Sequence, residues 1–206
     1  MSVITESAPI ANGRAAIPTD YIWRLTVEQY HQMIQAGILD EDDPVELLEG
    51  WLVYKMAKNP PHRVVTGLIR EAVSRLLPPG WFIDTQEPLT TEDSEPEPDI
   101  TVIRGDQRDY VDHHPGPQEV ALLVEVADSS LRRDREWKKR IYAEARVPVY
   151  WVVNLPKRQI EVYADPSGPA EHPDYRQCQT FTEAEEVPVV IDGREVGRLP
   201  MRELLP

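Results

Sequence analysis

Apolar residues recur along this chain with two different periods, and these periods predict its secondary structure. Between residues 61 and 77 apolar side chains return at helical spacing, which predicts a long amphipathic helix that ends before Pro-Pro-Gly. Residues 26–36 open with a T-V-E-Q capping box and predict a shorter helix. Residues 134–146 predict a third helix, closed by Pro148.

Short apolar runs bounded by turn residues predict the strands. The run ALLVEVA at 121–127 is nearly continuous, as expected for a central strand buried on both faces. We also expect strands at 81–84 and 100–103, a pair around E-G in VELLEGWLVYKMA, strands VYWVVN and QIEVYA, and an edge hairpin in the proline-rich tail. Because strand 121–127, a helix and strand VYWVVN follow one another, these two strands should be parallel. The pattern predicts an α/β fold, a mixed central sheet flanked by helices.

Length and composition favour a single domain. The 206 residues suffice for one core, and we expect residues 1–18 to form a disordered arm and residues 19–206 to form the domain. One cysteine, Cys178, cannot make an internal disulfide. No signal-peptide pattern and no membrane-length apolar stretch is evident, so we expect a soluble cytoplasmic protein.

The net charge of -14 argues against a nucleic-acid enzyme, because DNA-binding proteins usually present a basic surface. Residues 130–147, however, hold seven Arg or Lys against three acidic residues. This excess could face phosphate. It could equally belong to a solvated helix laced with ion pairs between neighbouring turns.

Glu125 is the most informative single residue. An ionised carboxylate within an apolar central strand is costly to bury unless a cation, a metal or dense hydrogen bonding compensates it. Asp99 begins the neighbouring apolar segment and follows Pro98, which stiffens its approach. Two such carboxylates would suit Mg²⁺ or Mn²⁺. The alternative for Asp99 is an ordinary turn residue at the start of a strand.

Lys138 offers the cation that phosphodiester hydrolysis needs near its metal. Asp134, Lys138 and Tyr142 are spaced i, i+4 and i+8, so they share one stripe of a helix. Periodicity alone favours a simpler interpretation, in which Asp134 and Lys138 form a surface pair and Tyr142 lies at the edge of the apolar face.

Taken in order, several segments resemble one family: the Uma-type restriction-endonuclease-like proteins of the PD-(D/E)XK nuclease superfamily. The resemblance runs from about Tyr21 to about Tyr163. It rests on VELLEG, the Pro-Pro-His that opens the long helix, EPEPDI, LLVEVADSSLRRDREWKKRIYAEARVPVYWVVN and IEVY.

The resemblance implies a role for each candidate residue. Asp99 and Glu125 match the two metal carboxylates, whereas the usual lysine two positions after the second acid is replaced by Ala127. In this family the lysine corresponds to Lys138 on the following helix, where the D-x-x-x-K-x-x-x-Y spacing matches Asp134, Lys138 and Tyr142, so the resemblance makes Tyr142 a weaker candidate neighbour of the site. Glu46 resembles an acidic residue supplied by an N-terminal element, although an exposed acid is the alternative for it.

Three further side chains are weaker candidates for the same site. His62 matches the family's Pro-His pair and could contact phosphate or a metal-bound water, although a capping or surface role is the more common one for such a histidine. Gln86 and Ser129 could donate hydrogen bonds around the site, although a structural role is the default for both.

The resemblance thus implies a Mg²⁺-dependent endonuclease that cleaves DNA and acts as a homodimer. A non-catalytic member of the fold that binds a partner is the main alternative, favoured by the negative charge and the displaced lysine. Hydrolysis of a small phosphate ester is a third possibility, for which an acidic surface is less of a handicap.

Overall fold

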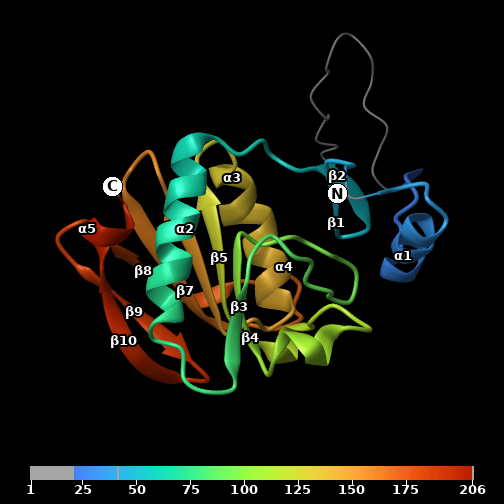
Figure 1. The fold of residues 1–206 in the computed structure, drawn as a ribbon. Coiled ribbons are helices and arrows are strands. Elements are labelled where there is room, and N and C mark those ends of the chain that lie inside the picture. The colour runs from blue at the N-terminus through green and yellow to red at the C-terminus, as the bar shows by residue number, and fades with distance from the viewer. Residues whose placement is uncertain (1–20, 41, 206) are drawn as a thin grey trace, which may run out of the picture.

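A six-stranded mixed sheet forms the centre of the molecule, in the order β3-β4-β5-β6-β7-β8 (Figure 1). The computed structural model describes residues 21–40 and 42–205, so the predicted arm at 1–18 lies outside the described residues. Strands β5 and β6 are parallel, as predicted, and the other neighbours are antiparallel. The strands are β3 (Trp81–Asp84), β4 (Ile100–Arg104), β5 (Val120–Ala127), β6 (Val149–Asn154), β7 (Gln159–Pro166) and β8 (Tyr175–Phe181).

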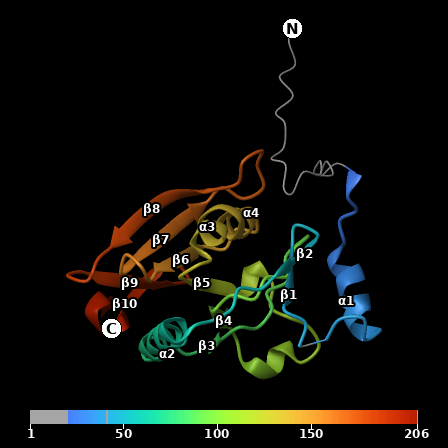
Figure 2. The ribbon, with the colours of Figure 1, turned by 90° about the horizontal axis from the view of Figure 1, so that it is seen from above.

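Helices cover both faces of this sheet, which confirms the predicted fold class (Figure 2). One face carries helix α2, the hairpin of β9 and β10, and the short helix α5. The opposite face carries a continuous helical segment made of α3, η4 and α4. Their bounds are α2 (Pro60–Ser74), β9 (Glu186–Ile191), β10 (Arg194–Pro200), α5 (Met201–Leu204), α3 (Leu131–Arg133), η4 (Asp134–Lys138) and α4 (Lys139–Glu144).

Side chains along β5 point alternately to the two faces of the sheet, so each packs either under α2 or under α4. Val124 and Val126 belong to the core beneath α2, whereas Leu123 and Ala127 belong to the core beneath α4. Because successive side chains of a strand point to opposite faces, Glu125 lies on the α4 side. The helix that carries Lys138 therefore covers the face on which Glu125 is found.

The N-terminal elements lie beside the sheet (Figures 1 and 2). Helix α1 (Val27–Gln35) begins at the predicted capping box, and β1 (Val45–Leu48) pairs with β2 (Trp51–Tyr54) as the expected hairpin. A bridge between Leu47 and Glu95 ties this hairpin to the segment that leads into β4. The hairpin thereby brings its residues close to the start of β4.

The C-terminal tail differs from the expectation. The predicted edge hairpin is β9–β10, but it forms a separate two-stranded sheet over the α2 face, and the edges of the central sheet are β3 and β8. Alternate residues Val187, Val189 and Ile191 are fully buried, so this hairpin covers the core with one apolar side. Strand β8 was not predicted because only its terminal Tyr175 and Phe181 are buried.

Smaller differences concern the helices. The long helix begins one residue earlier than predicted and ends at Ser74, and the third helical segment begins at Leu131 rather than at Asp134. The predicted loop between β4 and β5 contains two short 3-10 turns, η2 (Gln107–Tyr110) and η3 (Pro117–Glu119). None of the described helices has the length and apolarity needed to cross a bilayer. Cys178 is exposed on β8.

Candidate active site

Glu125 meets a lysine and a tyrosine from the covering helix. The Lys138 ammonium lies 2.9 Å from Glu125 Oε1, and the Tyr142 hydroxyl donates to the same oxygen at 2.8 Å. Asp134 and Lys138 are only 1% and 2% exposed, and Tyr142 is fully buried. The interpretation of these three residues as a surface pair with a neighbouring edge residue is therefore wrong. Glu125 is compensated from the helix, as its burial in an apolar strand requires.

Asp99 precedes β4 and points toward the carboxyl end of β5. Its Oδ2 accepts a hydrogen bond of 2.8 Å from the Val126 amide and lies 3.0 Å from Nε2 of His62. His62 lies in the first turn of α2, where Asn59 caps the helix by accepting from the His62 amide. The Thr66 hydroxyl donates to the His62 carbonyl one turn later. The start of α2 thus holds the Asp99 carboxylate in a single orientation.

Glu46 comes from β1 and reaches the same place from the other side. Its Oε2 lies 3.0 Å from the Lys138 ammonium and accepts from the Glu97 amide. Its Oε1 lies 3.6 Å from the Arg133 guanidinium. Glu46 is 1% exposed, so the alternative of an exposed acid is wrong. The nearby Glu49 turns away and forms a two-point ion pair with Arg140.

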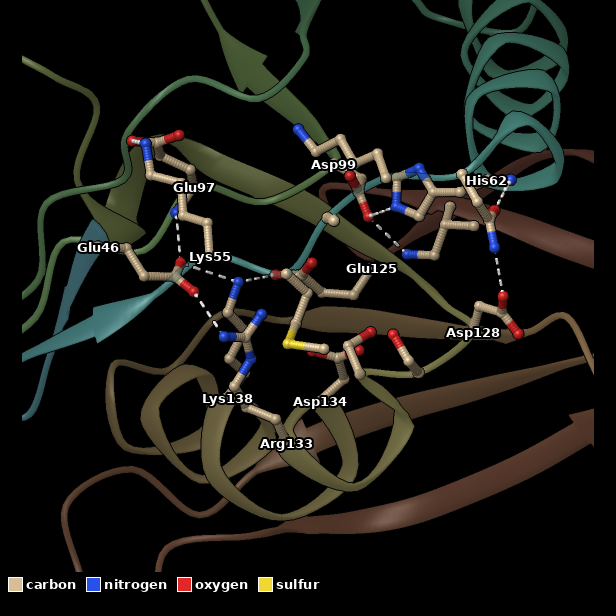
Figure 3. Close-up of a pocket in the computed structure, with 17 residues that line it drawn as sticks. Glu46, Lys55, His62, Glu97, Asp99, Glu125, Asp128, Arg133, Asp134 and Lys138 are labelled. Carbon is tan, nitrogen blue, oxygen red and sulfur yellow. Dashed lines mark hydrogen bonds and ion pairs between the residues drawn. The ribbon is translucent and has the colours of Figure 1, made fainter. Parts of the chain in front are cut away.

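These side chains surround a cavity of about 50 Å³, enough space for a small ion or a few water molecules. Figure 3 shows the Lys138 ammonium between the carboxylates of Glu46 and Glu125, and the Asp99 carboxylate on the side of the cavity next to His62. The lining residues are Glu46, Lys55, Met56, Ala57, Lys58, Asn59, His62, Glu97, Asp99, Glu125, Val126, Asp128, Ser129, Ser130, Arg133, Asp134 and Lys138.

The cavity has an excess of negative charge. Burial is the largest cause that raises the pKa of Glu125, to about 8; Lys138 opposes this shift, and the neighbouring carboxylates of Asp134, Asp99 and Glu46 add to it. Burial also raises the pKa of Asp134. For Lys138, burial favours the neutral amine, but the surrounding carboxylates outweigh it and hold its pKa above the usual value. The carboxylates around Lys138 therefore favour its charged ammonium form.

The donor set fits a hard divalent cation. Oδ2 of Asp134, which lines the same cavity, is buried and has no hydrogen-bond partner among the described residues, so it can accept from a water or contact a cation. No three Asp, Glu, His or Cys side chains among residues 21–40 and 42–205 are close enough to enclose a metal by themselves. Mg²⁺ commonly binds through one or two carboxylates and completes its shell with water and substrate phosphate. Asp99 and Glu125 are the two carboxylates that would hold it.

A π turn lies at the centre of the site. In η4 the Lys139 amide bonds to the Asp134 carbonyl five residues earlier, and the Tyr150 hydroxyl donates to the same carbonyl at 3.0 Å. Such wider turns are rare and often occur at functional sites. Here the turn contains both buried charged residues of the helix, Asp134 and Lys138.

The structure also separates the weaker candidates. Ser129 lines the cavity, whereas Gln86 does not; the Gln86 amide donates to the carbonyl of Pro98, beside Asp99. Cavity residues that the sequence analysis missed include Lys55, Lys58 and Asp128. Asp128 accepts a hydrogen bond from Asn59, the cap of α2. The position of Asn59 directly before Pro-Pro is a local sequence signal for the helix cap, but not for the contact with Asp128.

Comparison with known proteins decides the family. Residues 27–201 match the model of the Uma2 family, described as "Putative restriction endonuclease". The chain belongs to this family. The match spans all the elements that build the cavity, from α1 to the start of α5, and it confirms the resemblance found in the sequence.

A solved structure shows the same fold as this family member. It is described as a putative nuclease belonging to DUF820, from Anabaena variabilis ATCC 29413. It superimposes with a TM-score of 0.64 at 15% sequence identity, over 87% of this chain and 97% of that one. At this identity the likeness concerns the fold alone. No curated protein matches the chain significantly.

Proposed function

We propose that this Uma2 protein is a metal-dependent endonuclease that hydrolyses phosphodiester bonds of DNA, with Mg²⁺ or Mn²⁺ held by Asp99 and Glu125. One observation carries the proposal. Two buried carboxylates, Asp99 directly before β4 and Glu125 on the adjacent β5, line one small, negatively charged cavity together with the buried ammonium of Lys138. Membership of a family described as restriction endonucleases supports DNA as the substrate.

Each candidate residue of the site has a distinct role in the proposed reaction. A bound divalent cation would polarise a phosphoryl oxygen and lower the pKa of a coordinated water. Lys138 supplies a fixed positive charge for the negative charge that develops on the phosphoryl oxygens. Glu46 and Tyr142 are positioning residues, since the first contacts the Lys138 ammonium and the second donates to Glu125. His62 positions Asp99.

The displaced lysine is compatible with this mechanism. In the superfamily pattern the lysine would stand at Ala127, whose position on β5 faces the α4 side like Glu125. Lys138 reaches Glu125 from that same side, at 2.9 Å. Charge stabilisation depends on where the ammonium lies and not on which element supplies it.

Supercoiled plasmid nicking tests the proposal. Purified protein is incubated with plasmid in Mg²⁺, Mn²⁺ or EDTA, together with variants Glu125→Gln and Lys138→Met, whose folding is checked by circular dichroism. We expect nicking by the wild type with metal but not with EDTA. We expect at least a hundredfold loss in both variants, the order of magnitude for removing a group that stabilises the transition state.

A matched variant controls for the loss of a buried carboxylate. Glu161→Gln changes a buried acid on the same sheet face, but Glu161 does not line the cavity. It should nick plasmid at the wild-type rate. If the folded wild type cleaves no DNA while calorimetry detects Mg²⁺ binding that Glu125→Gln abolishes, the site is a metal site with another substrate. If the folded wild type shows neither DNA cleavage nor Mg²⁺ binding, the proposed function is wrong and the partner-binding alternative takes its place.

A further inference from the structure

Nearly all the cations of the helical segment that covers the site are neutralised by carboxylates, most of them from other elements of the chain. Of the seven Arg and Lys in residues 130–147, six form ion pairs within the described part of the chain, with Arg146 as the exception. One of these pairs joins neighbouring turns of the helix, and the others reach other elements. This stretch therefore offers little free positive charge to a phosphate backbone.

Free positive charge lies instead on and next to α2. Residues 55–80 contain five Lys or Arg and one acidic residue, Glu71, in a chain whose net charge is -14. Lys58, Arg63 and Arg70 are exposed and have no ion-pair partner among the described residues. Glu71 pairs with Arg75. The three unpaired cations form a row that begins before the helix and continues along it.

Two of these cations line a groove next to the candidate site. The groove has a volume of about 480 Å³, and its polar lining comes from α2 and from the residues after β3: Arg63, Thr66, Arg70, Glu71, Thr85 and Gln86. The one carboxylate among them, Glu71, is paired with Arg75. Gln86 has a φ of 62°, an unusual conformation for a residue other than glycine. Guanidinium, hydroxyl and side-chain amide groups are common donors to phosphate oxygens, and here Arg63, Arg70, Thr85 and Gln86 offer them. The Thr66 hydroxyl is buried and already donates to the His62 carbonyl.

The groove and the cavity share a wall. On the strand side, the Gln86 amide donates to the Pro98 carbonyl at 2.9 Å, directly before Asp99. On the helix side, Thr66 bonds to His62, which contacts Asp99. Lys58 lines the cavity itself. A chain of phosphates in the groove would therefore lie beside the metal carboxylate.

We propose that this groove binds the sugar-phosphate backbone of the DNA substrate, with Arg63 and Arg70 as phosphate contacts and Lys58 at the entrance to the cavity. The inference rests on the proposed function. The two arginines are two helical turns apart, about 10.5 Å along the helix axis. Phosphates of one strand follow at about 3.4 Å along the duplex axis, so the arginines span roughly three of them.

The salt dependence of DNA binding tests the inference. Fluorescence anisotropy measures the Kd of a labelled 30-base-pair duplex in EDTA, where binding is followed without cleavage, at several NaCl concentrations. Each lost phosphate contact lowers the slope of log Kd against log salt by about one. For the double variant Arg63→Ala, Arg70→Ala we expect a slope smaller by about two and weaker binding at low salt.

A second double variant separates local contacts from net charge. Arg194→Ala, Arg198→Ala removes two exposed arginines from β10 and changes the net charge by the same amount. Its slope should equal that of the wild type. If the wild type and both double variants have equal slopes and all nick plasmid, the groove does not bind the DNA backbone, although the proposed endonuclease function stands. Absence of any duplex binding and nicking by the wild type would overturn both.

Discussion

Two glutamates in one row of the sheet have opposite electrostatic environments. Glu125 on β5 is paired with Val152 on β6, which is paired with Glu161 on β7, so both carboxylates lie on the same face. Burial raises the pKa of Glu125, where a single ammonium is shared with Glu46. Burial also opposes ionisation of Glu161, but hydrogen bonds from Arg135 and Tyr163 outweigh it and lower its pKa.

This contrast predicts different responses to pH. Because the folded-state pKa of Glu161 is lowered, its stabilisation is complete above the unfolded-state pKa and disappears as pH falls through the folded-state pKa. Glu161→Gln should lower the free energy of unfolding by roughly 1.5–3 kcal/mol at pH 7, the usual range for hydrogen bonds to a charged group. The difference from wild type in urea denaturation should shrink steadily below pH 4.5. A constant difference down to pH 3 would contradict the assignment.

At the scale of elements, the β1–β2 hairpin decides whether Glu46 reaches Lys138. Its turn consists of Glu49 and Gly50, with φ of 49° and 78°. A Cβ on Gly50 would lie 2.7 Å from Cβ of Arg24 and 2.8 Å from the Leu25 carbonyl oxygen. The Leu25 amide also donates to the Gly50 carbonyl. Only glycine satisfies both the backbone conformation and this close approach.

Gly50→Ala should therefore destabilise the fold more than an equivalent change in an open turn. Gly193→Ala is the matched control, since Gly193 has a similar φ of 73° in the β9–β10 turn but nothing within 4 Å of its Cβ position. We expect a cost of roughly 1 kcal/mol for the control, from the left-handed conformation alone. The free energy of unfolding should fall further in Gly50→Ala, and plasmid nicking should fall with it. Equal losses of stability in the two variants would show that the contact with Arg24 is unimportant.

At the scale of the whole molecule, an acidic protein with a local basic groove should respond to salt in two opposite ways. A net charge of -14 destabilises the compact state by self-repulsion, which salt screens. Phosphate binding by Arg63 and Arg70 is weakened by the same screening. Stability and DNA affinity are thus predicted to change in opposite directions.

Differential scanning calorimetry checks the first half of this prediction. Raising NaCl from 0.05 to 0.5 M should increase Tm by a few degrees, about the size expected for 1 kcal/mol in a domain of this length. The double variant Arg63→Ala, Arg70→Ala has a more negative net charge, so its Tm should rise with NaCl by more than that of the wild type. A Tm that falls with salt would mean that the ion pairs outweigh the net repulsion.

Much of this protein could be predicted from its sequence by itself. Side-chain periodicity indicated nearly every helix and strand, since burial on one face leaves a local pattern. Glu125 was recognisable because a charged residue interrupts an apolar strand, and Pro98 marked Asp99 as the start of another. Family motifs singled out Lys138 although the lysine is absent from its usual position at Ala127.

Only the tertiary structure decided which distant residues meet. Glu46, and not Glu49, lines the cavity, and Asp134 and Lys138 are buried although their spacing suggested a surface pair. Gln86 borders a groove next to the cavity and not the cavity itself. Local sequence also could not distinguish neutralised cations from free ones, because most partners lie far away along the chain. Pattern along a chain reports which face a residue occupies, whereas packing between faces determines its partner, its charge state and so its chemistry.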